Sequence, residues 1–562
     1  MLNTFSKKSA SLLAAAAMAA VFACGTMAHA STTAATWAGA GSDDNWSTSA
    51  NWTSAGIPTS GNTTSVTFTG TVPNTTSNVN SAYTLNSLVF GTGSNDTITV
   101  AYTLTGSAIT LSGSNPIINS NAGKNGRVLQ TIDNNILLSP ATGSGNFNAA
   151  IKSNNGNLLL AGTITNSGNG VAFESDSGTG VITVSGSLSG TFGQVVVGAS
   201  SSTSTQITQW NGDNSTFNTN QLVIFSGTLQ LGNANALGLL NSGSKSIQLN
   251  NGANTNDPAL LTTVAMTIQD KIFLQTNGDG IGKNTVGGIG AFASTYTGNV
   301  ILGSNNASGS NYAQPLTVTA DSGGTVTFSG NLLAPTTLTT GTNDATTNDT
   351  LTKVGAGLVI LSGTGNDYTG TTTVQAGNLQ VNGALTGTGA VTVDSGATLS
   401  GVGSIAGAVT VNTGGILSPG DAPGTFTLSG GLTLANSGVL DFTLGSPNVA
   451  GGTGGNDLVS TAALTLGTGL TVHITQGAGY GTGLYHMIDY SGALTNNSNN
   501  FTGWTVTGLA AGQTAAFSLG ADGTSSAVNL TISSSSIPEP TTLGLLALGS
   551  LGILAGRRWR SA

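Results

Sequence analysis

The sequence predicts an all-β protein: a right-handed parallel β-helix with β caps at its ends, an N-terminal signal helix and a single C-terminal membrane helix. Three observations predict the β-helix. The 562-residue chain has 84 glycines and only 6% charged residues, against roughly 25% charged in an ordinary globular domain. Val, Ile and Leu recur in short runs separated by Gly, Asn, Ser and Thr, as in short strands joined by tight turns. Finally, segments of the sequence repeat at nearly constant offsets.

Composition also excludes two classes of protein. Gly, Thr, Ser and Asn disfavour long helices, so a helical protein is excluded. The formal net charge is −9, and no basic patch exists to neutralise phosphates, so we expect no nucleic-acid partner.

The repeats set the length of one coil. Residues 389–393 (GAVTV) recur at 407–411, an offset of 18, and Thr373-Val374 match Thr392-Val393 at 19. Eighteen residues at about 3.3 Å each make a circuit of roughly 60 Å, which suits three short strands joined by glycine turns. Alternation such as Val-Thr-Val predicts one inward and one outward face. A chain of β-sandwich domains is the alternative, and it should show linkers every ~100 residues.

The ends of such a stack need caps, because terminal coils expose unpaired strand edges. We expect an N-terminal cap at residues 31–90, the solenoid at 91–455 and a closing β region at 456–536. Two interpretations exist for the tryptophans of the first cap: a packed cluster that seals the first coil, or an exposed platform on which sugars stack. The three tryptophans are Trp37, Trp46 and Trp52.

Residues 1–30 have the pattern of a secretory signal. Lys7 and Lys8 precede an Ala-rich apolar stretch, and Ala28 and Ala30 give the small–x–small pattern for cleavage. A lipoprotein signal ending at Cys24 is the alternative. Cleavage after Ala30 would leave a chain without cysteine, and hence without disulfides or thiolate metal sites.

The C-terminal segment, residues 537–562, contains a Pro-Glu-Pro motif, an uncharged apolar run and a basic cluster. In order, they are Ile537, Pro538, Glu539 and Pro540; residues 541–556; and Arg557, Arg558 and Arg560. As a helix, the apolar run would reach about 24 Å, slightly short of a ~30 Å hydrocarbon core. The arginines should stay cytoplasmic, so we expect an inner-membrane-anchored intermediate. A buried C-terminal helix is the alternative.

This order of features resembles the PEP-CTERM sorting signal of Gram-negative bacteria, with Ile537 where Val is more usual. The resemblance implies an exosortase-type sorting enzyme as partner and cleavage near the Pro-Glu-Pro motif. It also implies a cell-surface or extracellular destination, often linked to exopolysaccharide.

A second segment, residues 351–379, resembles the autotransporter-associated β-strand repeat, and residues 210–231 are a degenerate copy offset by 150 or 151. Autotransporters follow such passenger repeats with a membrane barrel of alternating strands. We expect no such translocator here, so the resemblance covers the passenger only.

The search for catalytic chemistry is mostly negative. Asp43-Asp44 is the only adjacent acidic pair and is expected in a solvated turn, and His473 and His486 are expected on different strands. Residues 451–458 resemble a glycine-rich calcium repeat weakly, and a flexible loop is the better interpretation. We therefore expect no catalytic residues, metal or cofactor.

These observations predict an exported, non-enzymatic, adhesin-like surface rod that makes many weak contacts with exopolysaccharide or matrix glycans. The alternative is a carbohydrate-active β-helix enzyme, a polysaccharide lyase or hydrolase. Carboxylates converging in a cleft, or acids beside Arg127, would favour the enzyme.

Overall fold

The computed structural model describes residues 34–535 apart from short gaps, so the predicted signal and membrane helices lie outside the described residues. The gaps are residues 54–55, 93–97, 122–127, 142–147, 155, 176–178, 199–204, 251–256, 276–282, 304–312, 336–348, 421–422 and 497–500. In the described part, the helices are two short 3₁₀ turns, η2 (Ser49–Asn51) and η3 (Gly238–Leu240). Neither they nor any other described segment forms an apolar helix of membrane-spanning length.

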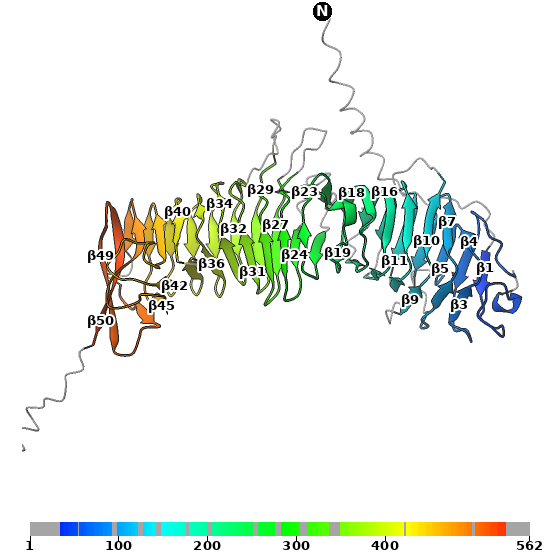
Figure 1. The fold of residues 1–562 in the computed structure, drawn as a ribbon, viewed down its shortest axis with the longest axis horizontal. Coiled ribbons are helices and arrows are strands. Elements are labelled where there is room, and N and C mark those ends of the chain that lie inside the picture. The colour runs from blue at the N-terminus through cyan, green and yellow to red at the C-terminus, as the bar shows by residue number, and fades with distance from the viewer. Residues whose placement is uncertain are drawn as a thin grey trace, which may run out of the picture.

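The strands stack along one axis into a rod, with the N-terminal coils at one end and β49 and β50 at the other (Figure 1). They belong to four sheets. The first sheet contains β1 (Ala34–Trp37), β2 (Ser65–Phe68), β4 (Tyr83–Leu85), β5 (Ser87–Phe90), β7 (Ile109–Gly113), β8 (Ile117–Ser120), β10 (Ile136–Pro140), β11 (Ala149–Ser153), β13 (Ile164–Ser167), β14 (Val171–Glu174), β16 (Leu188–Val197), β18 (Phe217–Ile224), β20 (Ser246–Asn250), β23 (Lys271–Gln275), β26 (Val300–Ile301) and β29 (Leu332–Leu333).

The second sheet runs along nearly the whole rod. It contains β3 (Thr76–Val79), β6 (Thr103–Gly106), β9 (Leu129–Ile132), β12 (Asn157–Leu160), β15 (Val181–Val184), β17 (Ile207–Trp210), β19 (Thr228–Leu231), β21 (Ala259–Thr262), β24 (Asn284–Gly288), β27 (Leu316–Ala320), β30 (Leu351–Val354), β32 (Thr372–Val374), β35 (Val391–Val393), β38 (Val409–Val411), β41 (Leu432–Leu434), β44 (Leu464–Leu466) and β47 (Leu494–Asn496).

Two shorter sheets complete the C-terminal part. The third contains β22 (Thr267–Ile268), β25 (Ala293–Tyr296), β28 (Thr325–Phe328), β31 (Leu358–Leu361), β33 (Asn378–Val381), β36 (Thr398–Gly401), β39 (Ile416–Pro419), β42 (Val439–Leu444), β45 (Thr471–Gln476) and β48 (Thr505–Thr507). The fourth contains β34 (Ala384–Leu385), β37 (Ser404–Ile405), β40 (Thr425–Leu428), β43 (Leu458–Thr461), β46 (Gly483–Tyr490), β50 (Ser525–Ser534) and β49 (Gln513–Asp522).

A coil within the stack adds two or three strands, each paired in parallel with a strand of the neighbouring coil, which makes the molecule a parallel β-helix. In N-terminal coils such as β7–β9, two of these strands belong to the first sheet and one to the second. β35, β36 and β37, for example, form one coil and pair in parallel with β38, β39 and β40 of the next. Antiparallel pairing joins β46 to β50 and β50 to β49, and this hairpin ends the stack. The predicted parallel stacking is confirmed and the chain of β-sandwiches is wrong, whereas the right-handed sense of winding stays a prediction.

The predicted offsets are confirmed as strand register. Val391 pairs with Val409, and Thr373 pairs with Thr392, as the repeats in the sequence require. The stack also extends beyond residues 91–455. At the front, β1, β2, β5 and β8 already pair in parallel, and at the back β45 pairs in parallel with β48.

Inward side chains form continuous apolar columns. In the second sheet, one column contains Val374, Val393, Val411, Leu434 and Leu466, each buried and each aligned with the next. Because one coil cannot bury its own inward face, stacking supplies the apolar burial that holds the rod together.

The turn between second-sheet and third-sheet strands requires a positive φ. Gly377 has a φ of +66°, and Gly396, in the next coil, has a φ of +77°. A Cβ at Gly377 would lie 2.5 Å from the carbonyl oxygens of both Gly355 and Gly357, whereas a Cβ at Gly396 would meet nothing within 4 Å. Alanine at Gly396 would therefore cause only backbone strain, whereas alanine at Gly377 would cause backbone strain and steric overlap with the neighbouring coil.

We expect Gly377→Ala to destabilise the protein more than Gly396→Ala. Both variants pay about 1–2 kcal/mol for a non-glycine residue in the left-handed region, but only the first also displaces backbone carbonyls. Urea unfolding of the two variants measures this difference. Equal losses would show that the neighbouring coil does not hold the Gly377 turn closely.

Candidate functional site

The three tryptophans of the first cap are buried in one cluster. Trp37, Trp46 and Trp52 are 1%, 0% and 5% exposed. The ring of Trp52 meets those of Trp37 and Trp46 edge-on, at centroid distances of 5.1 and 5.3 Å. The indole N–H of Trp46 donates to Ser77 Oγ at 2.7 Å. Because all three rings are buried, the packed cluster is confirmed, and the alternative of an exposed sugar-stacking platform is wrong.

A row of threonines lies on the outward face of the second sheet, one in each of nine consecutive coils. We call this row the threonine ladder; its members are Thr285, Thr317, Thr352, Thr373, Thr392, Thr410, Thr433, Thr465 and Thr495. Each is aligned directly with the next, and none is buried. At about 4.8 Å per strand, the ladder is roughly 38 Å long.

Hydrogen bonding distinguishes the threonine ladder from another polar row of the rod. None of the ladder hydroxyls hydrogen-bonds to another residue in the part of the chain that the structure describes. A polar row farther toward the N-terminus differs: Thr183 donates to Gln209, and Gln209 donates to Gln230, each at 2.9 Å. That row uses its hydrogen-bonding groups within the rod, whereas the ladder presents them to the surroundings.

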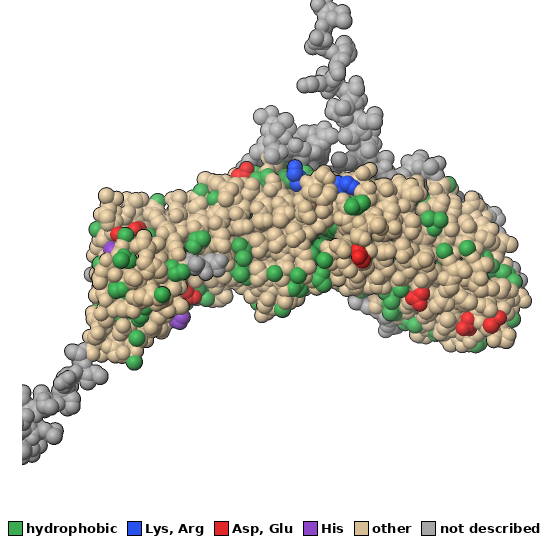
Figure 2. Space-filling model, viewed as in Figure 1, with side chains coloured by type: hydrophobic (Ala, Val, Ile, Leu, Met, Phe, Trp, Pro, Cys, Tyr) green, Lys and Arg blue, Asp and Glu red, His purple; other side chains and the backbone are tan. Residues whose placement is uncertain are grey.

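Charged side chains are few and scattered on the face shown in Figure 2. The carboxyl group of Asp43 accepts hydrogen bonds within its own turn, from the Thr48 hydroxyl and the backbone N–H of Asn45. These hydrogen bonds lower the pKa of Asp43. Asp441 faces His473 at 3.6 Å on adjacent strands, and both are partly exposed. Arg127 lies outside the described residues.

The glycine-rich segment 451–458 makes hydrogen bonds to neighbouring segments, and its flexibility stays a prediction. Asp457 accepts backbone N–H groups from Gly424 and Thr443, so its carboxylate is already engaged. Burial raises the pKa of Asp457 to about 6 despite these hydrogen bonds. The backbone N–H of Gly451 donates to Asp522 at 2.8 Å, which brings the loop against the cap hairpin.

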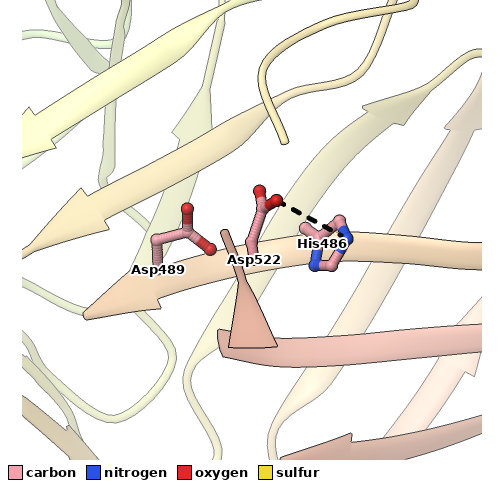
Figure 3. A group of neighbouring side chains, drawn as sticks. All are labelled: His486, Asp489 and Asp522. Atoms are coloured by element: carbon pink, nitrogen blue, oxygen red, sulfur yellow. Dashed lines mark ion pairs between the residues drawn. The ribbon is translucent and has the colours of Figure 1, made fainter. Parts of the chain in front are cut away.

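One cluster of ionisable side chains stands out among the described residues. His486, Asp489 and Asp522 each offer a nitrogen or oxygen atom, and these three atoms lie within 4.8 Å of one another (Figure 3). We call this group the cap cluster. The side chains of His486 and Asp522 are 10% and 15% exposed. Burial, and then the negative charge of Asp522, raises the pKa of Asp489 to about 6, while His486 acts in the opposite direction.

Sequence reasoning missed the cap cluster for a structural reason. Residues three apart on a regular strand point to opposite faces, so His486 and Asp489 gave no signal as a pair. A register irregularity between His486 and Ile488 turns both side chains to the same side. Asp522 lies at the end of β49. It is more than 30 residues from His486 and Asp489 in the sequence, and no motif connects it with them.

A lysine occupies an inward position in the second sheet. Lys353 is aligned with Val374 in the apolar column described above, and it is fully buried. Its ammonium group donates to the carbonyl oxygens of Val354, Gly355 and Ala376 at 2.7–3.0 Å. Burial lowers the pKa of Lys353 to about 8.

We expect Lys353 to make stability depend on alkaline pH. The folded state releases this proton near pH 8 and the unfolded chain near 10.5, so the unfolded state binds more protons between these values and stability rises with pH. The unfolding temperature of the wild type, relative to Lys353→Met, should therefore increase from pH 7 to pH 9.5. A difference independent of pH would contradict the buried, titrating ammonium group.

The predicted processing residues lie outside the described residues. They are Ala28 and Ala30 at the N-terminus, and Ile537, Pro538, Glu539, Pro540, Arg557, Arg558 and Arg560 at the C-terminus.

Comparison with known proteins identifies two segments and one relative. Residues 351–381 match the passenger-associated-transport-repeat, and residues 536–560 match the PEP-CTERM protein-sorting motif. In the structure, the first segment spans β30 to β33 and includes one coil, because Leu361 pairs with Val381. Part of the chain is 35% identical over 204 residues to the adhesin BmaC autotransporter of Brucella suis biovar 1 (strain 1330). This match covers 29% of the chain and 5% of the adhesin. The chain thus carries a passenger-type repeat and a PEP-CTERM sorting motif.

Proposed function

We propose that the protein is an exported, adhesin-like rod that is displayed at the cell surface and binds neutral polysaccharide along the threonine ladder. The ladder carries this proposal, because it repeats one free hydroxyl at each coil. A single hydrogen bond contributes only about 0.5–1.5 kcal/mol net. Many equivalent hydroxyls on one rigid face can bind a repeating polymer through their number.

Charge restricts the class of polymer. Without the two terminal segments, residues 31–536 contain seven basic and twenty acidic side chains. A surface with this excess of negative charge repels anionic polymers and favours a neutral glycan of the exopolysaccharide or matrix. The carbohydrate-active enzyme remains the alternative, and loss of glycan length on incubation with the protein would favour it.

The sorting motif and the adhesin relative support display at the surface. We propose that an exosortase-type enzyme recognises residues 536–560 after the chain has passed through an inner-membrane-anchored intermediate. The non-enzymatic character of the rod is part of this proposal.

Replacing ladder threonines by valine should weaken glycan binding without unfolding the rod. Valine keeps the branched shape and suits a strand, but it lacks the hydroxyl. We expect a variant with valine at Thr373, Thr392, Thr410 and Thr433 to lose more than tenfold in avidity for cell-derived exopolysaccharide. The matched variant with serine at these four positions keeps the hydroxyls and should retain most of the binding. Equal binding by the valine variant would exclude the ladder as the binding face.

Removal of the sorting segment should change the destination of the protein. A chain that ends at Ser535 lacks the whole matched motif. We expect it to accumulate in the periplasm or medium, whereas the full chain fractionates with the envelope and then the surface. Immunoblots of cell fractions measure this, and a variant with alanine at Pro538, Glu539 and Pro540 tests the motif at unchanged length. Unchanged envelope retention of both variants would contradict the assigned role of the tail.

A further inference from the structure

The cap cluster joins segments that close the C-terminal end of the rod. His486 and Asp489 lie on β46, the last strand of the fourth sheet to pair in parallel, and Asp522 is the last residue of β49. The ion-pair line in Figure 3 joins His486 to Asp522, with Asp489 beside them. The cluster has no role in the proposed glycan-binding face, which lies on the second sheet.

The orientation of His486 leaves an electron pair directed at a carboxylate. Its Nδ1 lies 2.8 Å from the amide oxygen of Asn529, which can only accept, so Nδ1–H is the donor. In neutral imidazole Nε2 then carries a lone pair, and it lies 3.8 Å from Oδ1 of Asp522. A positive charge between these two electron-rich atoms, either a proton on Nε2 or a metal ion, would stabilise the arrangement.

Asp489 supplies an independent observation. Its Oδ1 is shielded from solvent and receives no hydrogen bond from any residue that the structure describes. A buried oxygen without a partner is costly, more so when it carries charge. Asp522 differs, because its Oδ2 accepts the N–H of Gly451 and its Oδ1 remains for the cluster. A cation bound beside Oδ1 of Asp489 would supply the partner that this oxygen lacks among the described residues.

We propose that His486, Asp489 and Asp522 bind one divalent transition-metal ion, with Zn²⁺ preferred and Mn²⁺ bound more weakly. One imidazole nitrogen and two carboxylate oxygens are ligands that these ions accept, whereas Ca²⁺ takes six to eight oxygens. Ligand atoms at ~2.1 Å from one ion can be at most about 4.2 Å apart. The 3.8 Å pair meets this limit. The three ligand atoms lie within 4.8 Å of one another, and we expect small side-chain rotations on metal binding to bring all of them inside the limit.

Asn529 is the positioning residue of this site. Its hydrogen bond to Nδ1 orients the imidazole and fixes which nitrogen faces the metal, as carboxylates and amides commonly do behind metal-bound histidines. The ion links β46 to the β49–β50 hairpin, and through Asp522 it also holds the loop that contains Gly451. Its role is therefore to fasten the end of the rod.

The test is metal binding by the full chain, purified without a polyhistidine tag and stripped with EDTA. We expect isothermal titration with Zn²⁺ to show one equivalent per chain, with Mn²⁺ weaker and Ca²⁺ and Mg²⁺ weaker still. Zn²⁺ should raise the unfolding temperature and slow amide hydrogen exchange in β46, β49 and β50. A wild type that binds none of these ions would overturn the proposal and leave a proton on Nε2 as the bridging charge.

Matched variants assign the binding to this cluster. Asp489→Asn and Asp522→Asn should each lower the Zn²⁺ affinity at least tenfold, and Asn529→Ala should lower it about 10–100-fold. Asp441→Asn is the control, because Asp441 also lies beside a histidine but outside the cluster, and it should bind as the wild type does. Hydrogen exchange without metal shows whether each variant keeps the hairpin paired. Full binding by both cluster variants, or its loss in Asp441→Asn, would overturn the assignment.

Discussion

The structure depends on the register between consecutive coils. A strand inside the stack donates and accepts its backbone hydrogen bonds with the coils before and after it, and its inward side chain continues an apolar column. Register is preserved while coil length varies: Thr373 pairs with Thr392 across a short coil, whereas Thr317 pairs with Thr352 across a much longer one. Insertions therefore collect in the turns, and the sheets continue past them without slipping, because a one-residue slip would turn the column outward.

The short coils could be predicted from the sequence because no insertion interrupts their repeat of 18 or 19 residues. Residues 389–393 recur at 407–411 without an intervening insertion, and their strands are where the alternation of Val and Thr places them. Nearer the N-terminus, Ile109, Ile136 and Ile164 are equivalent, but the coils that separate them are longer, and no motif marks them as copies. The tryptophans left two interpretations open for a related reason: composition gives the presence of aromatic rings, and only packing decides whether their faces are covered.

Polar groups were harder to place than apolar ones. The threonine ladder follows from inward–outward alternation once register is known, yet the sequence spaces its members irregularly. Lys353 obeys the same alternation and consequently points inward, where three backbone carbonyls replace water around its charge. The cap cluster required a local departure from alternation, at the irregularity after His486, together with a contact to a distant hairpin. Regular alternation thus predicts the apolar columns and, once register is known, the outward threonines, whereas the cap cluster arises where the alternation is interrupted.

The unpaired strand edges of the terminal coils are covered differently at the two ends of the rod. This difference matters for how the rod would be held at the cell surface. At the front, buried indoles pack over the first coils. At the back, β50 reverses direction and pairs along its whole length with β49 while also pairing with β46. β50 ends at Ser534, one residue short of the matched sorting segment, which begins at residue 536. If the rod were held by that segment, a pulling force would reach the solenoid through β50. Antiparallel pairing on both sides of β50 and the cap cluster, which links β46 to the end of β49, would resist the separation of these strands. The strongest connections of the cap therefore lie where the force would be applied.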